Sequence, residues 1–135
     1  MEFNGQYLTY EKYVGLGGTL SQMPFNLLEF EARRRIDLKT FNRLKNIDSE
    51  DIPVEVLLCE YKLIESIQNY ANTMQGIAGN GNVSSETIDG YSVSYLTSSQ
   101  VSDIVKSKQN ELDEIIRTYL LNVILNGEHL LYVGV

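Results

Sequence analysis

The stretch DIPVEVLLCEYKLIESIQNYAN, residues 51–72, decides the fold of this chain. Pro53 lies where a helix would begin, a position at which its missing N–H is not needed. From there apolar side chains recur at helical spacing and cover roughly 200° of the helix circumference. They are Val56, Leu57, Cys59, Tyr61, Leu63, Ile64, Ile67, Tyr70 and Ala71. A helix with so wide an apolar surface needs neighbours on at least two sides, so this segment is predicted to be the central helix of a small bundle.

Two further long helices and one short helix are predicted around the central one. A short helical turn, capped by Thr9, precedes a glycine-containing turn at residues 15–18. Ser21 is predicted to cap a helix that lasts to about Thr40 and carries two apolar stripes. The first stripe is Phe25, Leu28, Ala32 and Ile36, and the second is Leu27, Phe30, Leu38 and Phe41. Residues 98 to about 125 have the clearest amphipathic pattern, and Asn126-Gly127 is interpreted as the stop of that helix.

The pattern changes between the central and the last helix. Residues 73–84 are rich in Gly and Asn and are predicted to be a mobile loop. Asp89-Gly90 is a favoured dipeptide for a two-residue turn, so residues 84–96 are predicted to be a β-hairpin. An isolated hairpin is only marginally stable, so this one is expected to pack on a helix or on another subunit, and a subunit contact is predicted. The residues predicted for that contact are Ile88, Tyr91, Val93 and Tyr95.

The expected fold class is therefore mainly α. It is a small bundle of three main helices plus a short N-terminal one, with a β-hairpin insertion and a short C-terminal tail. At 135 residues the chain is predicted to form a single domain, residues 1–135, with a core of its own.

Charge and composition limit the classes of function. A formal net charge of −7 disfavours a protein that grips nucleic acid by its phosphates, which requires clustered Lys and Arg. The single Cys59 cannot form an internal disulfide and is typical of a reducing compartment. Neither a membrane-spanning run nor a signal peptide is recognisable in the sequence. The protein is therefore expected to be intracellular and not to associate with a membrane.

Catalytic and metal-binding patterns are not found in the sequence. With one His and one Cys, the chain has no paired metal-ligand spacing and no nucleophile motif. His129 is interpreted as a surface or packing residue and Cys59 as a small core residue. No catalytic residue, metal site or cofactor is predicted, and the protein is not expected to be an enzyme.

Glu60 is the one charged residue that projects into the apolar arc of the central helix. A buried carboxylate without a partner is costly, so Glu60 is predicted to form an ion pair with an arginine of residues 33–35, most naturally Arg34 or Arg35. The three consecutive arginines point about 100° apart on a helix and cannot form one nucleic-acid patch, which favours charge pairing.

Five segments resemble, in the right order, the head–tail connector (adaptor) proteins of tailed phages and prophages of Gram-positive bacteria. The first is YLTYEKYVGLGGTL at residues 7–20, and the second runs from Phe25 through Glu29 and Arg33 to Asp37. The third is the Ile-Pro helix start at residues 52–53. The others are the hairpin at residues 85–95 and the terminal residues 130–135.

This resemblance implies a non-enzymatic virion protein that is made in the cytoplasm of the bacterial host. In such assemblies about twelve copies form a homo-oligomeric ring under the portal protein. The ring prolongs the DNA channel, through which DNA passes without specific binding, and presents a platform for the next connector, stopper or tail component. The net acidic composition suits a channel that does not trap DNA.

The terminal motif is the part of the resemblance that implies partner binding. Five apolar residues are expected to bind the portal or the neighbouring subunit, with the aromatic one as the anchor. They are Leu130, Leu131, Tyr132, Val133 and Val135. The competing interpretation is that the tail is a strand or plug that completes the core of its own chain. Relatives often carry Arg where this chain has Val133, so the resemblance does not extend to an ionic docking contact at that position.

Two other readings of the sequence remain open. A small helical protein–protein adaptor unrelated to virions would form a small discrete oligomer and show no affinity for a portal. A small DNA-binding regulator is disfavoured by the charge and by the lack of a basic recognition helix. A gel-shift assay with nonspecific DNA at low salt distinguishes the regulator from the other two.

Overall fold

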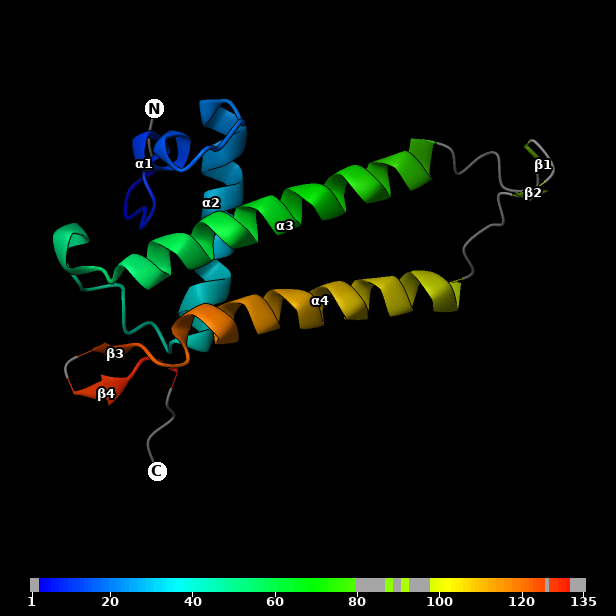
Figure 1. The fold of residues 1–135 in the computed structure, drawn as a ribbon. Coiled ribbons are helices and arrows are strands. Elements are labelled where there is room, and N and C mark those ends of the chain that lie inside the picture. Colours follow the sequence, from blue (N-terminus) through cyan, green and yellow to red (C-terminus); the bar gives the residue numbers. More distant parts are fainter. Residues whose placement is uncertain (1–2, 80–86, 89–90, 93–97, 126, 132–135) are drawn as a thin grey trace.

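The structure is a computed structural model that describes residues 3–79, 87–88, 91–92, 98–125 and 127–131, with side chains described outside residues 73–100. It is mainly helical (Figure 1). The helices are α1 (Tyr10–Gly15), α2 (Gln22–Lys39), the 3-10 turn η1 (Ser49–Asp51), α3 (Val54–Gly79) and α4 (Ser98–Leu120). The predicted bundle of three main helices and a short N-terminal one is confirmed.

The starts of α1 and α3 follow the signals that the sequence carries. The Thr9 hydroxyl accepts a hydrogen bond from the Lys12 backbone N–H at 3.3 Å, as expected of an N-cap. Pro53 lies directly before α3, and its carbonyl accepts the first turn's hydrogen bond from the Val56 N–H at 3.0 Å.

The three main helices form one packed core. In Figure 1, α3 and α4 run side by side in opposite directions and α2 crosses them steeply; α3 packs against both neighbours. Its buried residues include Val56, Cys59, Leu63 and Ile64, so Cys59 is the core residue that the sequence predicts. Among the described residues, no helix has the length and hydropathy needed to cross a membrane.

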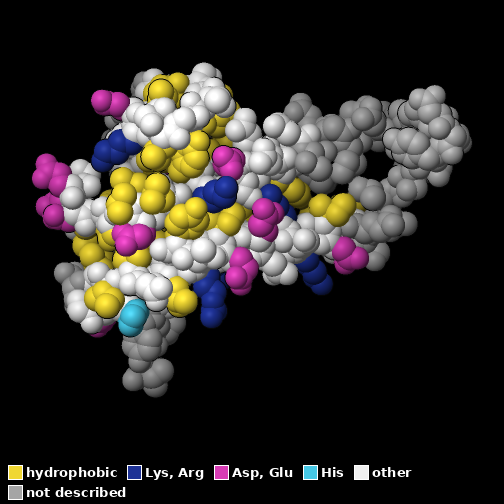
Figure 2. All heavy atoms as spheres, viewed as in Figure 1, with side chains coloured by type: hydrophobic (Ala, Val, Ile, Leu, Met, Phe, Trp, Pro, Cys, Tyr) yellow, Lys and Arg dark blue, Asp and Glu magenta, His cyan; other side chains and the backbone are white. Residues whose placement is uncertain are grey.

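Apolar side chains also reach the surface of the packed core. Figure 2 shows them on one face of the molecule, with acidic side chains at the end where η1 lies. The first apolar stripe of α2 is buried, since Phe25, Ala32 and Ile36 are fully covered. The second stripe is not: Leu27 is 58% exposed and Leu38 is 76% exposed. One face of α2 therefore builds the core and another remains open.

The central helix is longer than predicted. It continues to Gly79, so residues 73–79 are helical and the prediction of a loop over 73–84 is wrong for that part. The segment NTMQGIAG contains no proline, and a glycine within a helix costs only about 1 kcal/mol relative to alanine. Residues 80–86 lie outside the described residues.

The predicted hairpin is present as two short antiparallel strands, β1 (Thr87–Ile88) and β2 (Tyr91–Ser92). Thr87 pairs with Ser92 and Ile88 with Tyr91, which leaves two residues between the paired strands. Figure 1 draws this hairpin beyond the ends of α3 and α4, away from the core. The side chains of Ile88 and Tyr91, and all of Val93 and Tyr95, lie outside the described residues, so their subunit-contact role stays a prediction.

The last helix is shorter than predicted, and a second hairpin follows it. Helix α4 ends at Leu120 rather than near residue 125. Strands β3 (Ile124–Leu125) and β4 (Glu128–His129) then pair, with Ile124 opposite His129. The Asn-Gly dipeptide at 126–127 lies between these strands instead of stopping a helix, and Gly127 has a φ of +83°. Asn-Gly is favoured in both settings, and the β-branched Val123 and Ile124 before it favour the strand.

The turn after α1 depends on close packing between a glycine and an aromatic ring. Tyr13 is 4% exposed, and its hydroxyl accepts a hydrogen bond from the Leu20 N–H at 3.1 Å. Gly18 lies so close to this ring that a Cβ at position 18 would overlap its atoms. Gly15 has open space around it.

We expect Gly18→Ala to destabilise the protein by about 1–3 kcal/mol, because the buried Tyr13 ring has to shift. Gly15→Ala is the matched control and should leave stability unchanged or raise it slightly. Thermal unfolding of the two variants measures the difference. Equal melting temperatures for both would show that the ring moves at no cost.

Candidate functional site

Two buried carboxyl groups face each other between α2 and α3. Glu29 and Glu60 are both fully buried, and each carboxyl group lies close enough to shift the pKa of the other. Oε1 of Glu29 and Oε2 of Glu60, both buried, have no hydrogen-bond partner. Because two ionised carboxylates in one buried site repel each other, we infer that one of the pair holds a proton that these two oxygens share. Burial, followed by the negative charge of Glu29, raises the pKa of Glu60 well above its ordinary value, so Glu60 is the group that holds it.

The N-terminal segment is hydrogen-bonded to this carboxyl pair. The Leu8 N–H donates to Oε1 of Glu60 at 3.2 Å, and the Tyr7 N–H donates to Oε2 of Glu29 at 3.4 Å. The Tyr7 hydroxyl donates to Oδ1 of Asp37 at 2.5 Å. Burial and this hydrogen bond raise the pKa of Tyr7, which therefore stays protonated as the donor. Two consecutive backbone amides and one phenol thus join residues 7–8 to α2 and α3.

The predicted ion pair between Glu60 and Arg34 or Arg35 is wrong. Arg35 lies 3.5 Å from Glu31 and donates to Oε1 of Gln109 at 2.7 Å, which joins α2 to α4. The arginine of the carboxyl cluster is Arg33, whose Nε lies 3.3 Å from Oε2 of Glu29, although without hydrogen-bond geometry.

The physical reason is that the partner of Glu60 comes from a segment distant in sequence. The chain at residues 7–8 occupies the space over Glu60 and supplies a backbone donor, and a shared proton replaces the cation. Arg34 lies on the outward face of α2 and is exposed. The broader interpretation of the arginine run as charge-pairing residues is confirmed for Arg33 and Arg35.

The carboxyl cluster has a structural role: it holds the N-terminal segment against α2 and α3. Its members are covered, and their polar atoms are directed at one another or at the N-terminal segment. In the part of the chain that the structure describes, no group of three His, Cys, Asp or Glu residues has a metal-binding arrangement. Burial raises the pKa of the Cys59 thiol, so that thiol stays protonated. His129 is exposed.

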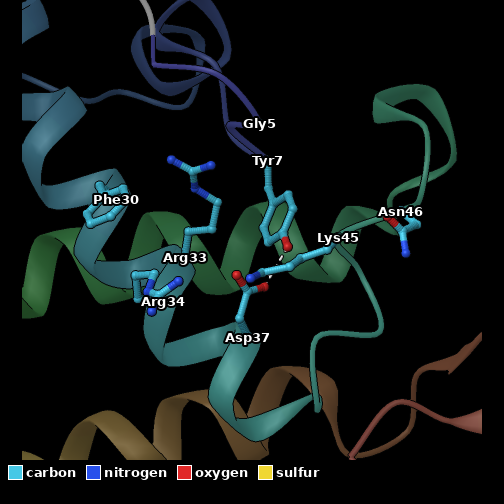
Figure 3. Close-up of a pocket in the computed structure, with 8 residues that line it drawn as sticks. All are labelled: Gly5, Tyr7, Phe30, Arg33, Arg34, Asp37, Lys45 and Asn46. Atoms are coloured by element: carbon cyan, nitrogen blue, oxygen red, sulfur yellow. Dashed lines mark hydrogen bonds between the residues drawn. The ribbon is translucent and has the colours of Figure 1, made fainter.

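A cationic surface pocket lies outside this cluster. It has a volume of about 390 Å³ and is formed by the N-terminal segment, α2 and the loop after α2 (Figure 3). Arg33, Arg34 and Lys45 bring three cationic side chains to it, and Asp37 is the one carboxylate among its lining residues. Phe30, 48% exposed, lies at its edge. In a chain with a net charge of −7, this pocket is a local exception.

The terminal motif divides into a buried and an undescribed part. Leu130 is fully buried in the core, and its N–H donates to the Val123 carbonyl at 2.9 Å. Arg43 donates to the carbonyls of His129 and Leu130 at 2.8 and 3.1 Å. The prediction that Leu130 binds a partner is therefore wrong, because its side chain completes the core of its own chain. Leu131, half-buried, packs against that core. Tyr132, Val133 and Val135 lie outside the described residues.

The sequence offered one signal for the carboxyl cluster that pattern reading missed. Glu29, Arg33 and Asp37 are spaced by four residues and so share one line along α2. Two acids and a base on one line of a helix, between apolar stripes, indicate a buried polar network. No local signal shows that Tyr7 and Leu8 meet this line, since that contact depends on tertiary structure.

Comparisons of the chain with protein-family models, with curated proteins and with solved structures find no match. The structure and the sequence themselves thus provide the basis for a functional assignment.

Proposed function

We infer that the protein is a structural component of a phage or prophage virion, a ring-forming head–tail connector that docks under a portal. The resemblance of five ordered segments motivates this assignment. The structural observation that best supports this assignment is that the packed core and the β1–β2 hairpin lie at opposite ends of the molecule. Residues 7–20, most of α2, the start of α3 and Leu130 converge on one packed end, while the β1–β2 hairpin lies at the other.

This arrangement suits a connector subunit. A packed end with open apolar residues can bind neighbouring subunits, and a hairpin carried away from the core can reach the next component in a stack. Leu27, Phe30 and Leu38 lie on one side of α2 and are 58%, 48% and 76% exposed, which is a larger open apolar surface than an isolated soluble chain favours. Net negative charge lets DNA pass a ring without being held.

The experiment is co-expression with the portal protein encoded nearest to this gene. Electron microscopy of the purified material should show rings stacked on portal rings. Truncation after Leu131 removes residues 132–135, including the anchor Tyr132, and should prevent stacking. A full-length protein that does not bind the portal would contradict the assignment and favour a helical adaptor unrelated to virions.

DNA binding is tested separately. We expect no gel shift with nonspecific duplex DNA at low salt, because the described cationic residues form no extended surface that follows a phosphate backbone. A salt-sensitive shift at micromolar protein would instead favour the DNA-binding regulator.

A further inference from the structure

We propose that the outward face of α2 binds the acidic corner at η1 and the start of α3 of a second copy of this chain. The outward face consists of Leu27, Phe30, Arg34, Leu38, Phe41 and Lys45. The acidic corner consists of Asp48, Glu50, Asp51, Val54, Glu55 and Leu58. This inference rests on the proposed function and deepens it by naming the contact between subunits.

The apolar part of the outward face is continuous along α2. Leu27, Phe30 and Leu38 are 58%, 48% and 76% exposed, and their spacing places them with Arg34 on one line of the helix. Phe41 follows the helix end and is 49% exposed. Its φ of 56° is an unfavourable left-handed conformation for a bulky residue. The turn thus holds a large apolar side chain at the surface without burying it.

The cations of this face have no partners within the described part of their own chain. Arg33, Arg35, Lys39 and Arg43 each lie within 4.0 Å of a carboxylate. Arg34 and Lys45 form no such pair and no side-chain hydrogen bond, and both line the pocket of Figure 3. A surface that combines unpaired cations with open apolar side chains is complementary to an acidic and apolar partner.

The chain itself carries such a surface. Asp48, Glu50, Asp51 and Glu55 are exposed and form no ion pair among the described residues. Val54, 60% exposed, lies between Asp51 and Glu55 in the sequence, and Leu58, 37% exposed, follows within the next turn of α3. Acidic side chains gather at this end of the molecule in Figure 2. Four unpaired carboxylates beside two open apolar residues match the outward face in both charge and polarity.

Nucleic acid is the less suitable occupant of the outward face. Two free cations are too few to hold a phosphate backbone, and the apolar residues around them would remain uncovered. A second copy covers both kinds of surface. Because the two surfaces differ, the contact is heterologous, and each added copy leaves one surface of each kind free. Such a contact repeats and closes into a ring when the rotation between copies permits.

The test uses charge reversal on each surface. Variant one is Arg34→Glu with Lys45→Glu. Variant two is Asp48→Lys, Glu50→Lys and Glu55→Lys, which leaves Asp51 as the one carboxylate of the corner and makes the corner net positive; all five substituted residues are exposed. Each variant alone places like charges opposite one another and should associate roughly a hundredfold more weakly than the wild type. An equimolar mixture restores opposite charges at every contact and should recover wild-type association. Arg117→Glu, an exposed change on α4, is the control and should have no effect.

Sedimentation velocity at increasing concentration provides the measurement, with circular dichroism to verify folding. The proposed interface would be overturned if variant one associates as strongly as the wild type. It would also be overturned if the mixture of the two variants stays dissociated. A wild type that remains monomeric at its solubility limit would overturn it as well. If the charge-reversal pattern holds but the assembled protein does not bind a portal, the interface stands and the connector assignment fails. If the wild type stacks on the portal while variant one assembles normally, only the interface fails.

Discussion

Glu60→Ala is expected to destabilise the protein by about 3–5 kcal/mol, a large fraction of the stability of a domain of this size. The substitution leaves a cavity beside the core. It also leaves the Leu8 N–H and Oε1 of Glu29 buried without partners. An unsatisfied buried polar group costs about 1–3 kcal/mol, so the loss exceeds that of an ordinary truncation. Chemical denaturation at pH 5 or below, where the wild type holds its proton, gives the value.

Glu60→Gln is the matched control for this prediction. An amide has the same shape, and its oxygen can accept from the Leu8 N–H while its NH₂ donates to Oε1 of Glu29. At about pH 5 the variant should lie within about 1 kcal/mol of the wild type. If Glu60→Gln were as unstable as Glu60→Ala, the shared proton would not describe this pair.

The same pair predicts how stability depends on pH. The folded-state pKa of Glu60 is raised, so the folded state binds more protons than the unfolded state above the ordinary glutamate pKa. The contribution of the pair is fully present below that ordinary pKa, about 4.3, and is lost as pH rises through the raised pKa. The slope reaches about 1.4 kcal/mol per pH unit for one proton. Tyr7, Glu29, Arg33, Asp37 and Cys59 are the titratable or charged groups around Glu60.

In Glu60→Gln this slope should vanish, because no proton has to leave the pair. The difference between the two proteins isolates the pair from surface groups such as Glu111, whose pKa is lowered by Lys108. Glu60→Gln should therefore become the more stable protein at high pH. Parallel stability curves for the two proteins would refute the protonated state of Glu60.

Helical periodicity was sufficient to predict the three main helices, because each buries a wide apolar surface that recurs every three or four residues. Helix ends were harder to predict. Residues 73–79 remain helical despite two glycines, and the Asn-Gly dipeptide at 126–127 lies in a hairpin where a helix stop was expected. Both signals have two local solutions, and packing of the neighbouring residues decides between them.

The candidate surfaces were only partly readable from the sequence. The two apolar stripes of α2 were visible, yet which one is buried depends on where α3 packs. Glu60 was identified as the residue that needs a partner, but its partners are a backbone N–H from residue 8 and a second acid. Contacts between residues 52 positions apart carry no local pattern, so a nearby arginine was the natural but wrong choice.

Truncation after Gly127 is expected to destabilise the protein by about 3–5 kcal/mol, contrary to the simple expectation for an apolar tail that serves a partner. The deletion removes Leu130, which is fully buried, and the strand that pairs with Ile124 and Leu125. It also removes the two carbonyls that accept from Arg43. The corresponding point variant, Leu130→Ala, should lose about 2–5 kcal/mol for the cavity alone.

Truncation after Leu131 separates the two roles of the tail, because it keeps every described contact of residues 128–131 and removes only residues 132–135. Its melting temperature should stay close to that of the full chain, whereas the protein truncated after Gly127 should melt at a far lower temperature. If both truncated proteins melt together with the full chain, Leu130 does not close the core. A third outcome is that only the protein truncated after Gly127 is unstable, while neither truncated protein stacks on a portal. The tail then has two parts: Leu130 stabilises the chain, and the residues beyond Leu131 bind its partner.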